Sequence, residues 1–419
     1  MLMGCFACIN DWNKVFAAGT KHKGVGKAWN GWKKGDFQVH FIYTGVCESM
    51  FIIFPDATTM LLDCGDHNAI GRGELAVSIL PDSNRHAGEW IARYVLRVNP
   101  KGKDVDYIML SHYHSDHGGC EVFYSSKDMR DGEEYILSGF SEAAEYLNFK
   151  KAIDRCWPDY SDPIVLKDDS ESQLTHMKKF YNYMQKHRGM KMEKFRLGEV
   201  NQIRMLSDAQ SYPDFSVRNI CANGRIAYEN GVIRDLYAEK IQKEHPDVLN
   251  ENGMSLGMVF KYGDFSFFTA GDFSDKWELP NGEVFEIEDA LADVCGEAQV
   301  AKLNHHGYYS MPKKLIKALH SKVYVSCVWD QLHDVSPVME RLSDRSIYPG
   351  GRIICPTIMP KERRKEDAGK KWLDDVDKSS YEGGHIVLNV TNAGKDYSIT
   401  YLSANDESMK VRSVMEFKS

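Results

Sequence analysis

The pattern of apolar and polar positions predicts β-strands at the start of the regular part of the chain. Residues 37–43, 50–54 and 58–62 are short apolar runs, separated by a glycine and by a Pro-Asp turn, as in antiparallel strands joined by tight turns. Apolar residues then fall at helical spacing over residues 89–98, and residues 105–110 form another short apolar run. We therefore expect a β-rich layer, followed by a helix and a further strand.

The second half of the chain returns to this β-rich pattern and alternates it with helices. Gly263-Asp264 separates two β-rich runs and indicates a hairpin, and helices are expected after Glu288 and over residues 337–342. The charged run 361–378 is expected to be an exposed connection between elements. The other strands predicted in this half are residues 254–262, 265–270, 300–303, 323–328, 352–355, 384–390 and 397–402.

Residues 120–250 have a looser pattern, and we interpret part of them as a variable insertion. A helix is predicted over residues 173–186, with strands over residues 202–206 and 215–221. At 419 residues the chain exceeds an average domain, although one domain with insertions reaches this size. The predicted division is an N-terminal extension over residues 1–35, one catalytic domain over residues 36–405 and a C-terminal tail over residues 406–419.

The composition narrows the classes of protein that the chain can represent. With 43% hydrophobic and 27% charged residues it is typical of a folded protein, and no apolar stretch approaches the roughly 20 residues that span a bilayer. The formal net charge of −8 gives no basic field for gripping a long nucleic acid, so a small-molecule or short phosphodiester substrate fits better. The sequence leaves the oligomeric state open.

The cysteines and the first residues bear on the cellular compartment. Ten cysteines are scattered without the dense spacing of a disulfide framework, so most are expected to be buried thiols. Cys5 and Cys8 form a lone C-x-x-C, for which a structural role is favoured over a metal or redox role. Met1 to Cys5 resemble the end of a lipoprotein signal, but the charged start and apolar core of such a signal are missing. We expect a cytoplasmic protein, with a truncated lipoprotein-like start as the alternative.

The strongest chemical signal is an H-x-H-x-D-H motif directly after the apolar run 105–110. It places His112, His114, Asp116 and His117 on a turn at a strand end, where several side chains can be aimed at one point. Neutral imidazoles and carboxylates are ligands that zinc takes. Four donors this close exceed what one ion needs when other ligands arrive from elsewhere, so we predict a pair of metals. Asp116 is the candidate catalytic group, which would accept a proton from water.

Further donors follow other predicted strands in the same way. Asp63 and Asp272 each follow an apolar run, and a carboxylate at Asp272 could bridge two cations about 3.5–4 Å apart. His305 and His306 also follow such a run, and one of them is expected to bind metal. We favour His306, because Gly307 beside it allows close approach of the backbone, and expect the other histidine to contact a ligand or the substrate.

The order of these motifs resembles that of the metallo-β-lactamase superfamily over about residues 37–402. The His-His-Gly form of the last motif, and residues 250–255 before the strand that leads to Asp272, are most similar to the hydrolase domain of the bacterial competence DNA-uptake channel and its soluble relatives. The motifs are Asp63-Cys64-Gly65-Asp66, His112-x-His114-x-Asp116-His117, Thr269-Ala270-Gly271-Asp272 and Asn304-His305-His306-Gly307.

The resemblance implies an α+β fold, a four-layer αββα sandwich with a variable insertion, and a dinuclear zinc site at one edge, with manganese or iron as alternative metals. By the family pattern His112 and His114 would hold one metal, Asp116 and His117 the other, and Asp272 would bridge them. Many members supply a further histidine before the bridging aspartate. The candidates for it in this sequence, none within a matching motif, are His176, His187 and His245.

The resemblance also implies a hydrolase in which a metal-activated hydroxide attacks a phosphodiester or related ester. Hydrolysis of a lactone or cyclic amide is an alternative that the same metals could perform. A non-catalytic iron-binding redox or sensor module is another, although members of that type usually carry an attached flavin domain. The residues that could line or reach the pocket, with packing roles favoured for each, are Lys302, Tyr308, Tyr309, His333 and His385.

Overall fold

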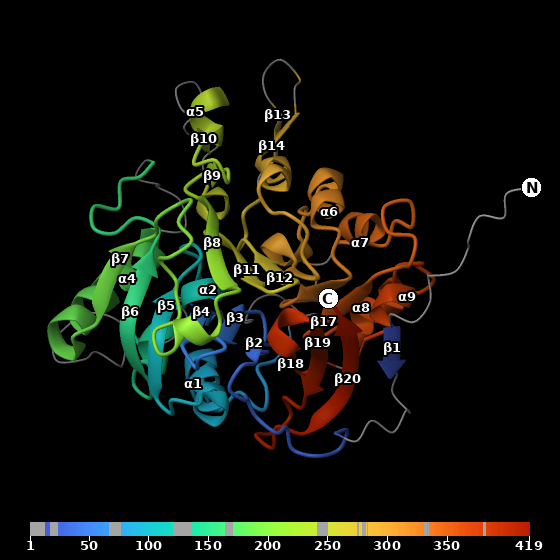
Figure 1. Ribbon diagram of the computed structural model, residues 1–419, viewed down its shortest axis with the longest axis horizontal. Helices are drawn as coiled ribbons and strands as arrows, with labels where there is room; N and C mark the ends of the chain where they lie inside the picture. The colour runs from blue at the N-terminus through green and yellow to red at the C-terminus, as the bar shows by residue number, and fades with distance from the viewer. Residues whose placement is uncertain are drawn as a thin grey trace, which may run out of the picture.

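The computed structural model shows an α+β sandwich of four layers in the order αββα (Figure 1). Two large mixed β-sheets pack face to face, and helices cover the outer face of each. Within the described part of the chain, no helix is both long and apolar enough to pass through a membrane. The described residues are 13–16, 24–66, 77–119, 136–163, 171–240, 250–274, 276–278, 282, 284–330, 333, 335–379 and 383–419.

The first sheet has ten strands, and it joins the two ends of the described chain. Counted across the sheet, neighbouring strands pair antiparallel on the side that runs from β1 through β20, β19, β18, β2 and β3 to β4. From β4 through β5 and β6 to β7 they pair parallel. Their order across the sheet is β1 (Asn13–Phe16), β20 (Val411–Lys418), β19 (Asp396–Leu402), β18 (His385–Thr391), β2 (Phe37–Phe41), β3 (Ser49–Ile53), β4 (Thr59–Cys64), β5 (Asp104–Met109), β6 (Asn148–Asp154) and β7 (Lys191–Lys194).

The second sheet has eight strands and the same mixture of pairings. It is antiparallel from β10 to β12 and parallel from β12 to β17, and a separate two-stranded ribbon, β13 (Lys276–Glu278) with β14 (Val284–Glu286), follows β12. The order across the sheet is β10 (Ile233–Asp235), β9 (Arg225–Ala227), β8 (Phe215–Ala222), β11 (Gly257–Tyr262), β12 (Phe265–Thr269), β15 (Val300–Lys302), β16 (Val323–Ser326) and β17 (Ile353–Pro356).

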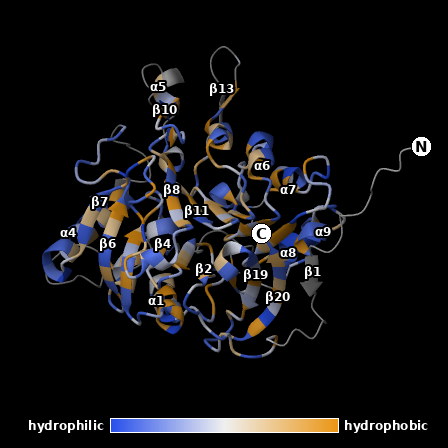
Figure 2. Ribbon diagram, viewed as in Figure 1, coloured by the Kyte–Doolittle hydropathy of each residue, from blue (hydrophilic) through white to orange (hydrophobic). Residues whose placement is uncertain are grey.

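Alternation along the strands produces the layers, because successive side chains of a strand point to opposite faces. In β3, Met50 and Ile52 enter the core between the two sheets, whereas Phe51 and Ile53 face the helices outside the first sheet. The helices outside the first sheet are α1 (Ala87–Val98), α3 (Phe140–Ala143) and α4 (Glu171–Arg188). Figure 2 shows both hydrophobic and hydrophilic colouring on α1, as expected of a helix with one face toward the sheet.

A third core lies outside the second sheet and completes the four layers. Phe268 of β12 points into it, while Phe267 beside it points into the core between the sheets. The elements that cover this face are η5 (Ile287–Asp293), α6 (Lys313–Leu319), α7 (Ser336–Leu342), α8 (Lys361–Glu366) and α9 (Leu373–Val376).

Most of the predicted strands match observed strands, but three predictions are wrong. Residues 202–206 form bends instead of a strand, because their backbone groups pair with side chains, as where Leu206 N donates to Thr58 Oγ1. The charged run 361–378, expected to be an exposed connection, contains α8 and α9. The helix expected after Glu288 is observed as the short 3-10 helix η5. The tail predicted over residues 406–419 is also wrong, since β20 is a full strand of the first sheet.

Both ends of the described chain belong to the sandwich. Met415 and Phe417 of β20 join the core between the sheets, and Gly26 N and Trp29 N, in the predicted N-terminal extension, donate to Val411 O and Met409 O. Residues 120–250, interpreted partly as an insertion, supply strands β6 to β10 and helix α4. The cysteines that the structure describes are buried thiols, and the C-x-x-C of residues 5–8, the lipoprotein-like start and His245 lie outside the described residues.

Candidate metal centre

The H-x-H-x-D-H motif leaves the carboxyl end of β5 and turns directly into α2 (Ser115–Gly118). His112 Nε2 lies 3.0 Å from His114 Nδ1, and Ser111 Oγ lies 3.0 Å from the other ring nitrogen of His112. Because β4 and β5 run parallel, the end of β4 lies beside this turn. The motif and the Asp63 segment therefore meet at one edge of the first sheet.

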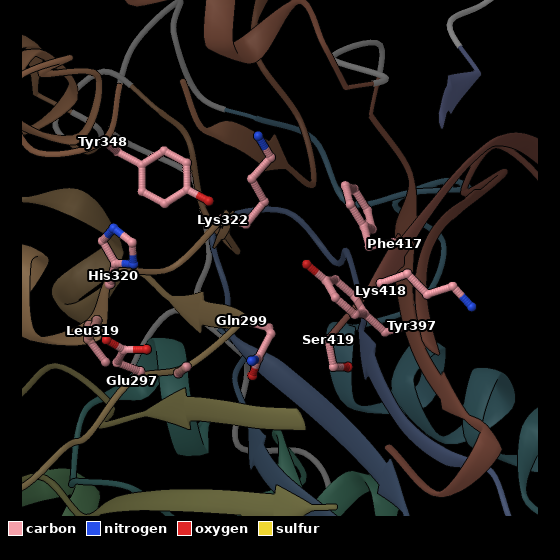
Figure 3. A pocket seen from close by; sticks show the side chains of 11 residues that line it. Glu297, Gln299, Leu319, His320, Lys322, Tyr348, Tyr397, Phe417, Lys418 and Ser419 are labelled. Atoms are coloured by element: carbon pink, nitrogen blue, oxygen red, sulfur yellow. The ribbon is translucent and has the colours of Figure 1, made fainter. Parts of the chain in front are cut away.

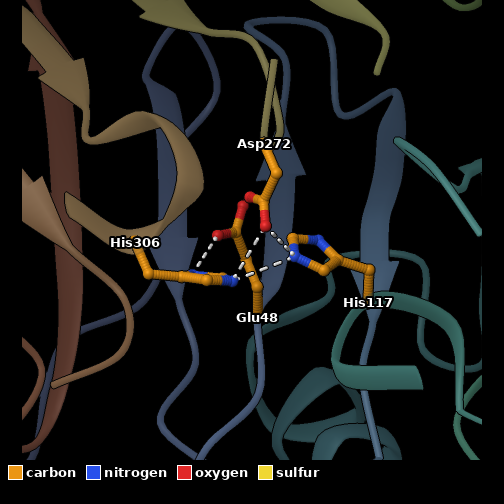
Figure 4. A group of neighbouring side chains, drawn as sticks. All are labelled: Glu48, His117, Asp272 and His306. Atoms are coloured by element: carbon orange, nitrogen blue, oxygen red, sulfur yellow. Dashed lines mark hydrogen bonds and ion pairs between the residues drawn. The ribbon is translucent and has the colours of Figure 1, made fainter. Parts of the chain in front are cut away.

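Asp63 holds the ring of His117 from behind. Its Oδ2 lies 2.9 Å from His117 Nδ1, and its Oδ1 accepts a hydrogen bond from Ser111 N at 2.7 Å. The opposite ring nitrogen, His117 Nε2, lies 3.2 Å from Asp272 Oδ2 and 3.1 Å from His306 Nε2 (Figure 4). Asp63 thus fixes the ring orientation, as carboxylates commonly do for metal-binding histidines.

Asp272 follows β12 and lies at the centre of the cluster. Its Oδ2 lies 3.2 Å from His117 Nε2, 3.3 Å from His306 Nε2 and 3.8 Å from His112 Nε2. Gly271 before it has a φ of +53°, and a Cβ there would lie 2.9 Å from the Cβ of Ser111. A side chain at that position would push the Asp272 segment away from the histidine turn.

His306, and not His305, points into the cluster. His306 Nε2 lies 3.3 Å from Asp116 Oδ2 and 3.3 Å from Asp272 Oδ2. The ring of His305 turns away, with Nδ1 2.7 Å from Ser274 Oγ and Nε2 facing an asparagine amide. Both histidines have left-handed backbone, with φ of 45° and 49°, which costs energy for residues with a side chain and is characteristic of functional sites.

Glu288 anchors the strained segment that carries these histidines. Its carboxylate accepts hydrogen bonds from Asn304 Nδ2 and from Met311 N, both at 2.9 Å, and so bridges the two ends of the segment. Ser310 Oγ donates to Asn304 O at 2.6 Å. Burial raises the pKa of Glu288 to about 8, so the carboxyl gains a proton far more readily than an exposed one.

Two further buried residues belong to the cluster: Glu48, which the sequence analysis did not single out, and Lys302, for which it favoured a packing role. Lys302 Nζ donates to Glu48 Oε2 at 2.9 Å, and both side chains are fully buried. Together with His117, Asp272 and His306, Glu48 brings ligand-type atoms within 4.8 Å of one another. The sequence did contain one signal, a lysine inside the apolar run of β15. A lysine in a buried strand requires a partner for its charge.

The charges of the cluster depend on one another. Burial by itself would raise the pKa values of Asp116 and Asp272, but His117 and His306 hold both well below the usual range for a carboxyl. Burial would likewise lower the pKa values of these two histidines, yet the carboxylates, with Asp272 foremost, raise them well above the usual imidazole value. Burial, helped by His117, lowers the pKa of His112 well below its ordinary value. Carboxylates and imidazoles thus stabilise each other's charged forms.

These residues fit divalent metal ions. Four carboxylates surround the site, those of Glu48, Asp63 and Asp272, which are buried, and that of Asp116, which is partly exposed. Among the described residues they face the imidazoles of His117 and His306 and the ammonium group of Lys302. Among those described residues, Asp272 Oδ1 and Glu48 Oε1 are buried without a hydrogen-bond partner. Buried charge of one sign requires compensation, and imidazole nitrogens with carboxylate oxygens form the donor set that zinc, manganese and iron accept.

The other histidines singled out by the sequence have different surroundings. His333 does approach the cluster: its ring lies 5.1 Å from that of His306, and its Nδ1 lies 2.8 Å from Asp330 Oδ1. His385 instead packs 4.4 Å from Tyr94 on the far side of the first sheet. Of the candidates for a further metal-binding histidine, both His176 and His187 lie in α4, where His187 packs on Tyr183.

A separate cavity of about 320 Å³ lies away from this cluster (Figure 3). Gln299 and Lys322, which line it, directly precede β15 and β16, whereas His306 follows the carboxyl end of β15. The two places are therefore at opposite ends of the same parallel strands. Since ligands of parallel sheets bind outside the carboxyl ends of the strands, the cluster and not this cavity is the candidate active site.

The fold and the cluster together define a metallo-β-lactamase-like α+β sandwich with a candidate metal centre at the edge where its two sheets meet. Residues 43–120, which include the H-x-H-x-D-H turn, match the family model described as Metallo-beta-lactamase superfamily. Over these residues, less than half of its length, the chain is similar to that superfamily. No curated protein matches the chain.

Proposed function

We propose that the chain is a metal-dependent hydrolase that acts on a phosphodiester or related ester. The observation that carries this proposal is the convergence of His117, Asp272 and His306, from three segments far apart in sequence, with donor atoms 3.1–3.3 Å apart. Two imidazole nitrogens, His117 Nε2 and His306 Nε2, thus lie 3.1 Å apart and both face Asp272 Oδ2, which is the arrangement of ligands that share a divalent cation.

The proposed centre holds two zinc ions, with manganese or iron as alternatives. His112 and His114 would bind one ion, Asp116, His117 and His306 the other, and Asp272 would bridge them; His305 remains outside. The bridging role is supported by Asp272 Oδ2, which faces His112 on one side and His117 and His306 on the other. Bound cations would lower the pKa of a coordinated water to about 7, supply the nucleophile and neutralise charge on the attacked group.

Asp116 is the proposed proton acceptor. Its side chain is 19% exposed, whereas those of His117, Asp272 and His306 are at most 3% exposed, so Asp116 is the member of the cluster that an incoming substrate and water meet. Its pKa is held well below the usual carboxyl range, so the carboxylate is ionised at neutral pH. The cause is His117 and His306, which outweigh the opposing effect of burial.

His333, whose ring lies 5.1 Å from that of His306, is the proposed substrate contact. Asp330 holds His333 Nδ1, which leaves the other ring nitrogen available, and the ring packs 5.8 Å from that of Tyr308 beside the cluster. An imidazole held in this way can donate a hydrogen bond to a phosphate or ester oxygen. The free, buried cysteines fit a reducing compartment, and we place the enzyme in the cytoplasm on that basis.

A substrate panel tests the proposal. The protein would be loaded with zinc, manganese or iron, and chromogenic phosphodiester, phosphomonoester, lactone and β-lactam substrates compared under the same conditions. We expect turnover of the phosphodiester, with loss of turnover in Asp116→Asn. If the protein preferentially hydrolyses the lactone or the β-lactam, the proposed phosphodiester substrate would be wrong and a lactone or cyclic amide would take its place. Binding of iron alone, with a redox signal and no turnover of any substrate, would refute the hydrolase in favour of a redox or sensor module.

A further inference from the structure

Glu48 and Lys302 form an ion pair that lies directly against the metal centre. Glu48 precedes β3 in the first sheet, and Lys302 ends β15 in the second, so the pair crosses between the sheets. Nζ and Oε2 are 2.9 Å apart, and both side chains are 0% exposed. Taking two charges out of water is costly, and apolar residues of similar size often replace such a pair without loss of stability. Stability alone therefore gives a weak reason for its presence.

The contacts of the pair point to a second role. Lys302 Nζ donates to Gly271 O at 2.8 Å and lies 3.8 Å from Asp272 Oδ1. Glu48 Oε2 lies 3.3 Å from His306 Nδ1. Each member of the pair thus touches one of the two central residues of the cluster. Figure 4 shows the Glu48 carboxylate between His306 and Asp272, on the side away from His117.

These contacts decide which atoms of His306 and Asp272 face the centre. An imidazole binds a metal through the nitrogen that carries no proton, and a carboxylate at the other nitrogen keeps the proton there. Glu48 is at Nδ1, while Nε2 faces Asp116 and Asp272. In the same way, Lys302 lies nearer Asp272 Oδ1, while Oδ2 faces the histidines.

We propose that Glu48 and Lys302 are a positioning pair, which directs Nε2 of His306 and Oδ2 of Asp272 toward the cation and thereby raises the affinity of the site for it. This inference rests on the proposed metal centre. Glu48 itself could instead be a ligand, since its carboxylate lies among the clustered donors. The shared engagement of Oε2 by Lys302 and His306 favours positioning over direct binding.

Three variants separate these roles: Glu48→Gln, Lys302→Met and the double variant that carries both. Each would be titrated with cobalt(II), a coloured substitute for zinc, to obtain the number of ions bound, the dissociation constant and the visible spectrum. The free energy of unfolding of the metal-free protein would be measured in parallel. Lys302→Met leaves Glu48 buried without its cation and should be the least stable, whereas the double variant removes both charges and should recover stability.

The double variant is the decisive one. If the pair positions the ligands, the double variant should regain stability. Its tighter cobalt site should nevertheless bind cobalt about 10–100-fold more weakly than the same site of the wild type, with a shifted visible spectrum. Contacts to the ligands of a metal change its affinity by this amount. A matched control is Arg345→Met. It removes one of the two cationic partners of Asp375, a fully buried carboxylate in α9 that Lys378 also contacts, and should lower stability without changing the cobalt spectrum.

Two results would overturn the proposal. A folded double variant that binds cobalt with the wild-type affinity and spectrum would show that the pair is only structural. Loss of a full equivalent of cobalt in Glu48→Gln would show that Glu48 is a ligand. Failure of the proposed function is a separate outcome: a wild-type protein that binds cobalt but hydrolyses no substrate would refute the hydrolase, while the comparison among variants would still decide the role of the pair.

Discussion

Replacing the two adjacent histidines by asparagine should have different effects on metal binding. His306 Nε2 lies within 3.3 Å of donor oxygens on Asp116 and Asp272, whereas His305 is held by Ser274 outside the cluster. Asparagine is the right substitution, because both positions have left-handed backbone, which asparagine tolerates. Alanine would lose the ring and keep a strain of about 1–2 kcal/mol per residue.

The expected magnitudes follow from these contacts. Loss of a group that only supports a ligand costs about 10–100-fold in metal affinity, so loss of the ligand itself in His306→Asn should cost more than about 100-fold. One equivalent of metal should then be absent from the purified protein. His305→Asn should retain both equivalents and weaken binding by no more than about 10-fold, since its hydrogen bond to Ser274 orients the segment without reaching the metal.

The assay is metal content by elemental analysis after dialysis, followed by a zinc competition titration on both variants. Circular dichroism and the free energy of unfolding of the metal-free proteins serve as controls, and they should agree between the two variants because the backbone is the same. Full metal retention in both would show that the segment from Asn304 to Gly307 lies outside the metal site. Loss of metal only in His305→Asn would exchange the two roles.

Three further predictions concern other parts of the site. Asp116→Asn should reduce turnover by at least about 100-fold while circular dichroism stays unchanged, because the partly exposed carboxylate serves the reaction and not the core; retained turnover would remove it from the mechanism. The folded pKa of Glu288 is about 8 against an ordinary 4.5, so its stabilising effect is complete below pH 4.5 and lost as pH rises to 8. The loss in the free energy of unfolding is roughly 3–5 kcal/mol at most. Between pH 5 and pH 8, denaturation should show a smaller loss for Glu288→Gln than for the wild type. An equal loss in both proteins would contradict the burial argument. Gly65→Ala should abolish metal binding, because its Cβ would lie 1.8 Å from Asp116 O, whereas Gly350→Ala, with its nearest neighbour at 3.8 Å, should bind metal normally in the same titration.

The sequence predicted the parts of the fold that depend on local pattern. Strands β2 to β5 and helix α1 were found within two residues of their observed ends, because alternation, helical spacing and turn residues are all short-range signals. Strand β20 was missed although Val411, Met415 and Phe417 alternate with polar residues. Its partner β19 is near in sequence, so the alternation itself was the overlooked signal.

The candidate site was predictable where donors form a motif, and not where they pair across the fold. The cluster at His112 to His117 and the aspartate at 272 stand out because several donors follow strand ends. Glu48 and Lys302 belong to different sheets, and only the packing of those sheets brings them together. The choice between His305 and His306 depends on the left-handed backbone of both residues, which no pattern of residue types specifies.

The order of strands in the first sheet has a consequence for the growing polypeptide on the ribosome. Strand β2 pairs on one side with β3, which is made immediately after it, and on the other with β18, whose Ile386 lies opposite Phe41. At about 5–20 residues per second, synthesis between these two residues takes roughly 20–70 s. During that time the edge of β2 is unpaired, and an open strand edge is a template for aggregation. A nascent chain of this protein should therefore depend on chaperones until its last strands emerge.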